Sequence, residues 1–242
     1  TLVNAYVTPL MARYLGRLAE SLDATPLRIM QSNGGSISAA MAARSAIHTI
    51  QSGPAGGVLG AVSVARHAGF DRIIGFDMGG TSTDVSLYDG RFSFTQESEV
   101  GDFPVRVPML DIHSVGAGGS SIARSDAGGA LRVGPQSAGA SPGPVCYGHG
   151  DRITITDANL CLGRIDPDKF LSGRMRLDPD RAARHLERFA RAHGVGTQEM
   201  ALAIIEVANS NMERAIRAVS IERGHDPREF ALFAFGGNGP VF

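Results

Sequence analysis

The sequence predicts an α/β fold in which short strands end in glycine turns and helices lie between them. Three observations support this fold class. Apolar runs stop at paired glycines, several segments carry apolar residues at helical spacing, and the 31 glycines among 242 residues are clustered. With 43% hydrophobic and 19% charged residues, the chain is long enough for one large or two small globular domains.

The expected elements follow from local patterns. Residues 1–23 have helical spacing, with an interruption or kink at Pro9, and residues 27–35 are a strand that enters a glycine turn. Two helical stretches follow, split at Gly53 and Pro54, and the second ends at Gly69. Beyond residue 90, the pattern predicts strands over 91–100 and 105–115, a loop-rich region over 116–150, helices over 178–193 and 198–223, and a strand over 230–235.

The segment GFDMGGTSTDVSLYDG, from Gly75 to Gly90, predicts a strand, a glycine turn and a second strand. It has no Lys-Ser/Thr after the glycines and no third spaced glycine, so it is neither a Walker loop nor a dinucleotide fingerprint. Glycines without a Cβ allow backbone amides to approach an anion closely. The candidate phosphate-binding residues are Gly79, Gly80, Thr81, Ser82 and Thr83. The alternative is an ordinary hairpin turn.

Two carboxylates flank this turn, Asp77 and Asp84. Mg²⁺ favours carboxylates together with substrate phosphates, so both could hold that ion through water or orient an attacking water. They are the first candidate catalytic residues, and His113 is the third. The C-terminal segment FGGNGP adds a second glycine turn after a strand, where Gly236, Gly237 and Gly239 would let a ring or a phosphate lie against bare backbone.

A second set of residues has metal-binding chemistry. Asp111 and His113 are two apart on a predicted strand, which places both on one face, where they could share a metal or work as acid and base. The following loop adds Cys146, His149 and Asp157. Imidazole and thiolate favour zinc or manganese over calcium. The alternatives are a structural His–Asp hydrogen bond, a small buried cysteine, and Asp157 as the N-cap of a helix.

Composition excludes other classes. A formal net charge of −1 gives no electrostatic case for nucleic acid or an anionic membrane as a partner. No apolar run approaches the roughly 20 residues that span a bilayer, and no basic-then-apolar leader is present. Two cysteines are too few for a disulfide framework. These features predict a cytoplasmic protein.

Seven motifs together resemble those of the hydantoinase A family, which includes 5-oxoprolinase and the nucleotide-binding subunits of acetone and acetophenone carboxylases. In order, they are QSNGG, SGPAGGVLGA, GFDMGGTSTDVSL, DIHSVGAGGSSIA, VGPQSAGASPGPVCYG, TDANLCLGR and FGGNGP. The resemblance covers nearly the whole chain. It departs at Ser120, Ser141, Asn238 and Phe242, where family members often have other residues.

The resemblance implies an actin-like, sugar-kinase-like (ribonuclease H-like) ATPase lobe with a mixed sheet flanked by helices. It implies ATP and Mg²⁺ as cofactors, ring-opening hydrolysis of a cyclic amide such as a hydantoin or 5-oxoproline, and a hydantoinase B-like partner subunit or domain. The alternative within the family is ATP-dependent carboxylation of a ketone. Outside it, the fold also hosts nucleotide-switch modules and sugar kinases.

The resemblance also implies that the chain is a central segment of a larger protein. The ATPase-lobe core is expected over 1–115 and 151–242, with 116–150 as a glycine-rich active-site loop region. An isolated segment is expected to be inactive and to self-associate as a homo-oligomer through the apolar residues of its first helix.

Overall fold

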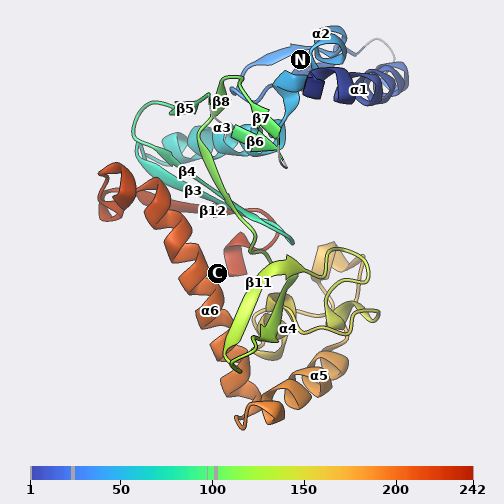
Figure 1. The fold of residues 1–242 in the computed structure, drawn as a ribbon, viewed down its shortest axis with the longest axis vertical. Helices are drawn as coiled ribbons and strands as arrows, with labels where there is room; N and C mark the ends of the chain where they lie inside the picture. Colours follow the sequence, from blue (N-terminus) through green and yellow to red (C-terminus); the bar gives the residue numbers. More distant parts are fainter. Residues whose placement is uncertain (1, 23–24, 97, 101–102, 242) are drawn as a thin grey trace. The chain divides into compact units, whose positions relative to one another are not determined.

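The computed structural model describes residues 2–22, 25–96, 98–100 and 103–241 (Figure 1). The chain divides into two compact units. The first unit comprises residues 1–75 and 86–112, and the second comprises residues 76–85 and 113–242. Phe242, one of the departures from the family pattern, lies outside the described residues. No helix in the described part of the chain is long and apolar enough to cross a membrane.

The first unit combines helices with short antiparallel strand pairs. Helix α1 packs on α2, and the side chain of Asn4 accepts a hydrogen bond of 3.0 Å from the amide of Ile47. A small apolar cluster joins Ala55 and Val58 of α3 to Leu110. The elements are α1 (Leu2–Ser21), β1 (Arg28–Met30), β2 (Ser36–Ser38), α2 (Ala39–Arg44), α3 (Ser52–His67), β5 (Phe94–Thr95), β6 (Ser98–Val100), β7 (Phe103–Val105) and β8 (Met109–Leu110).

Two helices in this unit, α1 and α3, differ from the sequence prediction at their proline residues. Helix α1 continues through Pro9 without a break in its assigned range. Helix α3 begins at Ser52, after Gln51 in the left-handed region, so Gly53 and Pro54 lie inside its first turn. Proline is tolerated there because the first-turn amides have no partner within the helix. The predicted end at Gly69 is confirmed: its φ is +86°, and the amide of Phe70 donates to the carbonyl of Ala65 at 2.9 Å.

Strands β3 (Ile73–Met78) and β4 (Thr83–Tyr88) pass from one unit to the other. They belong to a four-stranded sheet with the order β12-β3-β4-β9, in which β9 is Ile112–Val115 and β12 is Ala231–Phe235. The predicted strand–turn–strand at residues 75–90 and the strand before the last glycines are therefore confirmed.

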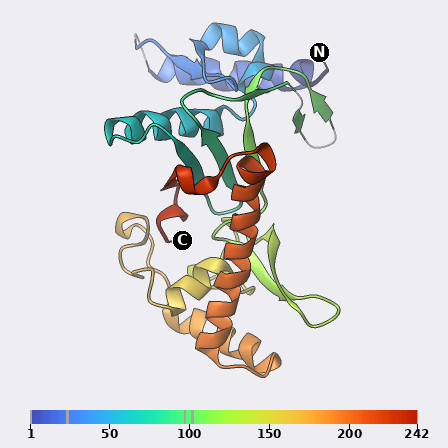
Figure 2. The same ribbon diagram turned by 90° about the vertical axis from the view of Figure 1, so that its left-hand side faces the viewer.

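The rest of the second unit is an antiparallel hairpin on a group of three helices. Helix α6 contacts β11, α4 and α5, and Figure 2 shows it from the side as the longest helix of this unit. The α4–α5 region encloses an apolar cluster of Cys146, Leu160, Leu177 and Ala182. The elements are β10 (Ser121–Ser125), β11 (Leu131–Ser137), α4 (Ile155–Cys161), α5 (Pro179–Ala192) and α6 (Thr197–Val219).

The region predicted to be loop-rich, residues 116–150, contains the β10–β11 hairpin, which the sequence analysis missed. Its strand pattern is obscured by Gly134 and Pro135 within β11 and by a register irregularity between Ser121 and Ala123. The predictions of α5 and α6 are confirmed within a few residues. Asp178 caps α5, and its carboxylate accepts from the amide of Arg181 at 2.8 Å.

Candidate functional site

The turn between β3 and β4 is exposed, while the strand ends on both sides of it are buried. Met78 and Thr83 are fully enclosed, whereas Gly80, Thr81 and Ser82 are exposed. The amide of Gly79 closes the turn by donating to the carbonyl of Ser82 at 2.9 Å. We call residues 77–84 the phosphate hairpin. The buried residues Met78 and Thr83 thus anchor the exposed turn between them.

A second glycine turn, Gly118–Ser120, hydrogen-bonds to the backbone of the phosphate hairpin, and we call it the backing turn. The amide of Gly119 donates to the carbonyl of Gly79 at 3.0 Å, and the amide of Ser120 donates to the carbonyl of Gly80 at 2.7 Å. A Cβ added to Gly118 would lie 2.6 Å from the carbonyl carbon and oxygen of Gly80. Only glycine allows the two backbones to approach this closely.

These contacts determine which way the turn presents its amides. In a trans peptide, the carbonyl of one residue and the N–H of the next point in opposite directions. The carbonyls of Gly79 and Gly80 point to the backing turn, so the N–H groups of Gly80 and Thr81 point away from it. Among the described residues, the amides of Gly80, Thr81 and Ser82 donate to no backbone carbonyl outside the strand ladders. The result is a pre-organised group of donors that suits an anion.

The C-terminal glycine motif also contacts the phosphate hairpin. The amide of Asn238 donates to the carbonyl of Met78 at 2.9 Å, and its side-chain amide donates to that of Gly79 at 3.1 Å. Any side chain at Gly236 would collide with the carboxylate of Asp77, and Gly236 has a φ of +82°. The structure therefore brings the two predicted glycine motifs together. The sequence marks Asn238 only as a departure from the family pattern, and no local pattern predicts its contact with the turn.

Asp77 and Asp84 lie close enough to influence each other electrostatically. Partial burial raises the pKa of Asp77 above its usual value, and the negative charge of Asp84 raises it further. One carboxylate oxygen of Asp84 accepts a hydrogen bond from the hydroxyl of Ser114. Two partly buried carboxylates that repel each other beside free amide donors fit a divalent cation bound together with a phosphate.

Other candidate residues have structural contacts. The hydroxyl of Thr83 is buried and donates to the carbonyl of Ala117 at 2.7 Å, which ties β4 to the segment before the backing turn. Gly239 is buried next to Ala234. His113 precedes Ser114 on β9, and successive side chains of a strand point to opposite faces. The imidazole therefore does not share the face from which Ser114 reaches Asp84. Gly237 is exposed.

Asp157 has a structural environment, and it is not the N-cap of α4. Thr154 is the N-cap, and Asp157 is the third residue of the helix in a reciprocal capping box. The buried carboxylate accepts from the amides of Val145 at 3.2 Å, Cys146 at 2.8 Å and Thr154 at 2.9 Å, and from the hydroxyl of Thr154 at 2.9 Å. Four hydrogen-bond donors therefore surround the Asp157 carboxylate, for which the sequence left metal binding and helix capping equally open.

The remaining members of the predicted metal set do not gather around Asp157. Cys146 is fully buried, and burial, followed by the charge of Asp157, raises the pKa of its thiol far above the usual range. This thiol stays protonated at neutral pH and is a poor nucleophile. His149 is exposed. Within the described ranges, no group of three or more His, Cys, Asp or Glu side chains could hold a metal ion. The set of Asp111, His113, Cys146, His149 and Asp157 stays a prediction.

Helix α4 nevertheless contributes to the site. The amide and the hydroxyl of Thr156 both donate to the carbonyl of Gly119, at 2.8 and 2.9 Å. Gly119 in turn donates to Gly79. The buried start of α4 therefore positions the backing turn, and the backing turn positions the phosphate hairpin.

Comparisons with known proteins show the family to which the chain belongs. A family model described as hydantoinase/oxoprolinase matches residues 1–242. The caprolactamase subunit alpha of Pseudomonas jessenii is 44% identical over 244 residues, which cover 98% of this chain and 35% of that protein. The 5-oxoprolinase 1 of Arabidopsis thaliana is 39% identical over 98% of this chain and 20% of its own length.

Solved structures give the same result. The crystal structure of the ATP-dependent caprolactamase from Pseudomonas jessenii matches with a TM-score of 0.85 and 41% identity, over 100% of this chain and 36% of that chain. Nucleotide-free acetone carboxylase matches with a TM-score of 0.85 and 31% identity, over 97% of this chain and 33% of that chain. The chain thus has the actin-like ATPase fold of these structures and spans about a third or less of the length of these relatives.

Proposed function

The chain belongs to the hydantoinase/oxoprolinase family, and on this basis we propose that it is the nucleotide-binding segment of an enzyme that uses ATP to open the ring of a cyclic amide. The observation that carries the proposal is the phosphate hairpin. Its carbonyls are bound by the backing turn and by Asn238, while the amides of Gly80 and Thr81 face away as free donors. Such donors bind the terminal phosphates of a nucleotide without reorganisation.

Each residue of the site has a role in this proposal. The amides of the turn and the hydroxyls of Thr81 and Ser82 hold phosphate oxygens. Asp77 and Asp84 would hold Mg²⁺, which supplies neutralisation of the phosphate charge, and Asp77 orients the attacking group. Gly236 leaves the space that the Asp77 carboxylate occupies. ATP would drive the ring opening because activation of the amide oxygen makes the carbonyl carbon a better electrophile for water, and the bond that then breaks is the ring C–N bond.

The names of the relatives support a cyclic-amide substrate and a partner subunit. One is a caprolactamase subunit and another a 5-oxoprolinase, so we propose a lactam or hydantoin substrate and a second, hydantoinase B-like chain or domain. The second candidate is ATP-dependent ketone carboxylation, and the likeness to acetone carboxylase at a TM-score of 0.85 favours it. The predicted Zn²⁺ or Mn²⁺ site has no comparable support.

The test is release of ADP by the intact protein with its partner chain in the presence of Mg²⁺. Hydantoin, 5-oxoproline, caprolactam, and acetone with bicarbonate are compared with no added substrate. The expected result is ADP release that depends on one of the cyclic amides. Stimulation by acetone and bicarbonate alone would establish the carboxylase instead. ADP release that no substrate alters would favour the nucleotide-switch class, and no ATP turnover in any mixture would refute the proposal.

A further inference from the structure

A groove with a volume of about 830 Å³ lies in the second unit, between the β10–β11 hairpin and helix α6. Its lining includes the apolar side chains of Val115, Val133 and Val207. We call it the arginine groove because four arginines line it: Arg124 and Arg132 from the hairpin, and Arg214 and Arg217 from α6. Glu213 is the one acidic residue in its lining.

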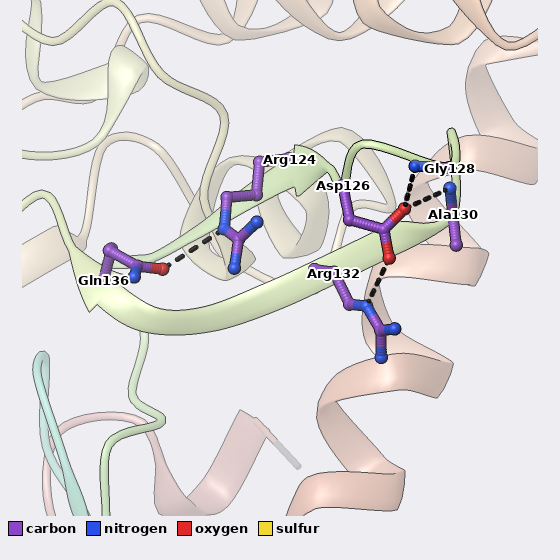
Figure 3. A network of polar contacts seen from close by, with 6 residues as sticks. All are labelled: Arg124, Asp126, Gly128, Ala130, Arg132 and Gln136. Atoms are coloured by element: carbon purple, nitrogen blue, oxygen red, sulfur yellow. Dashed lines mark hydrogen bonds and ion pairs between the residues drawn. The ribbon is translucent and has the colours of Figure 1, made fainter.

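The two arginines of the hairpin are direct cross-strand partners. Like charges placed opposite each other destabilise a strand pair, so this arrangement needs compensation. Arg132 has it: its Nε lies 2.9 Å from Asp126, whose carboxylate also accepts from the amides of Gly128 and Ala130 (Figure 3). The Nε of Arg124, in contrast, donates to the neutral side chain of Gln136 at 3.2 Å, so its charge is uncompensated (Figure 3).

Helix α6 repeats this pattern on its side of the groove. Arg217 forms an ion pair of 3.6 Å with Glu213. Arg214 donates to the side-chain carbonyl of Asn211, which carries no charge. Across the described part of the second unit, Arg124 and Arg214 thus have amide partners where Arg132 and Arg217 have carboxylates. One uncompensated guanidinium comes from each wall of the same groove.

We propose that the arginine groove binds a small organic anion, whose carboxylate or phosphate group is held by Arg124 and Arg214. The planar fork of arginine suits both groups because each can accept two parallel hydrogen bonds. The apolar residues of the lining suit a hydrocarbon body attached to the acidic group. The volume of about 830 Å³ falls within the range of small-ligand sites, roughly 300–1,000 Å³.

The groove does not include the amides that would face the nucleotide in the proposed function. It does include Ala117, which lies in the segment that holds the phosphate hairpin. Ala117 lines the groove, and its carbonyl accepts the hydroxyl of Thr83 at the end of the phosphate hairpin. An anion in the groove therefore lies against the segment that positions β4. A carboxylate substrate or product and a phosphorylated metabolite share the required chemistry, and binding experiments distinguish them.

The test is calorimetric titration of the intact protein at low salt and without ATP. The probes are glutarate, inorganic phosphate and the neutral glutaramide. We expect at least one anion to bind and glutaramide not to bind. The variants Arg124→Gln and Arg214→Gln should each weaken anion binding by about tenfold, the effect of losing one charge-assisted hydrogen bond. Arg184→Gln, which removes an exposed arginine of α5 outside the groove, should leave the affinity unchanged.

The outcomes separate the alternatives. Binding of glutarate alone identifies a carboxylate ligand. Binding of phosphate alone identifies a phosphate ligand of the groove where Arg124→Gln and Arg214→Gln weaken it, because phosphate bound at the phosphate hairpin would not respond to these variants. If neither anion binds at about ten millimolar, or if both groove variants bind as tightly as the wild type, the proposal is wrong. Arg124→Lys, which keeps the charge and loses the fork, should bind with intermediate affinity, and it replaces Arg124→Gln if that variant does not fold. Since ATP is absent, failure of the proposed function would not affect this result.

Discussion

The phosphate hairpin and the start of helix α4 are built from the same residue types but use them in opposite ways. In both, an aspartate lies near backbone amides and glycines. At α4, the buried carboxylate of Asp157 accepts four hydrogen bonds, all of them from donors of the protein itself. At the hairpin, the carbonyls are bound, the amides of Gly80 and Thr81 are free, and Asp77 remains partly exposed.

A ligand site is therefore distinguished by hydrogen-bonding groups that have no partner within the protein. A polar group whose partners are all supplied by the protein stabilises the fold, whereas one that is pre-positioned and unpartnered is available to a ligand. The two regions are also connected, because α4 holds the backing turn through Thr156 and Gly119. The start of α4, where the Asp157 carboxylate has all its partners, holds the backing turn in place. The backing turn in turn holds the phosphate hairpin, whose amides remain available to a ligand.

The largest effect is expected from Asp157→Ala. This change leaves the amides of Val145, Cys146 and Thr154 buried without an acceptor, so the free energy of unfolding should fall by about 3 kcal/mol or more. The matched control is Asp178→Ala, which removes an exposed helix cap with one such bond and should cost about 1 kcal/mol. Urea unfolding monitored by circular dichroism measures both.

The same experiment tests the metal prediction at Asp157. With the carboxylate saturated by protein donors, a chelator should leave the unfolding midpoint of the wild type unchanged. A midpoint that falls on addition of chelator and recovers with Zn²⁺ or Mn²⁺ would contradict the structural role and support the predicted metal set. Equal losses in the two aspartate variants would show that burial at α4 does not matter.

The next effect concerns Asp77. Asp77→Asn should lower ATP turnover by about 100-fold or more, because it removes one of the two carboxylates that would hold Mg²⁺ at the phosphates. Its thermal midpoint should nevertheless equal or exceed that of the wild type at pH 7, by no more than about 3 °C. The pKa of Asp77 is raised by folding, so its charged form destabilises the folded state above the pKa of the unfolded chain.

The pH dependence of this stability provides the check. The advantage of the Asn variant should be complete above the raised pKa and should disappear as pH falls below about 3.9, where Asp77 is protonated in both states. Calorimetric scans at several pH values measure it. A variant that is less stable at neutral pH would mean that Asp77 has a packing role, and unchanged turnover would remove it from the site.

The sequence predicted the strand–turn–strand at the hairpin and its neighbouring aspartates because these depend on local glycine and strand patterns. It also placed Gly236 in a related motif. It could not predict the backing turn's role, since the contacts of Gly119 and Ser120 with Gly79 and Gly80 link residues about 40 positions apart. No local pattern distinguishes a glycine that lets two backbones meet from one that only turns the chain.

The role of Asp157 was ambiguous for a related reason. A carboxylate at the start of a helix can cap it or bind a metal, and only the number of donors around it decides. Two of the four donors are the amides of Val145 and Cys146, which the sequence does not place next to α4. The β10–β11 hairpin was missed because Gly134 and Pro135 interrupt the strand pattern of β11.

The smallest of the three effects is expected at Asn238, whose side chain donates to the Gly79 carbonyl. Asn238→Ala removes one hydrogen bond and should raise the KM for ATP by about fivefold. Asn238→Asp places a carboxylate oxygen against that carbonyl, which repels it and turns the Gly80 amide away, so we expect about a tenfold rise. Added salt should not abolish the increase in KM of Asn238→Asp. Salt would screen a direct repulsion between the new carboxylate and the phosphates of ATP, but it would not correct a Gly80 amide that points the wrong way. Steady-state kinetics at two salt concentrations measure both KM values, and thermal midpoints check that the variants are folded. The expected KM increases at unchanged thermal midpoints would show that Asn238 positions the Gly80 amide. Equal KM values for the wild type and both variants would show that the backing turn alone positions the phosphate hairpin.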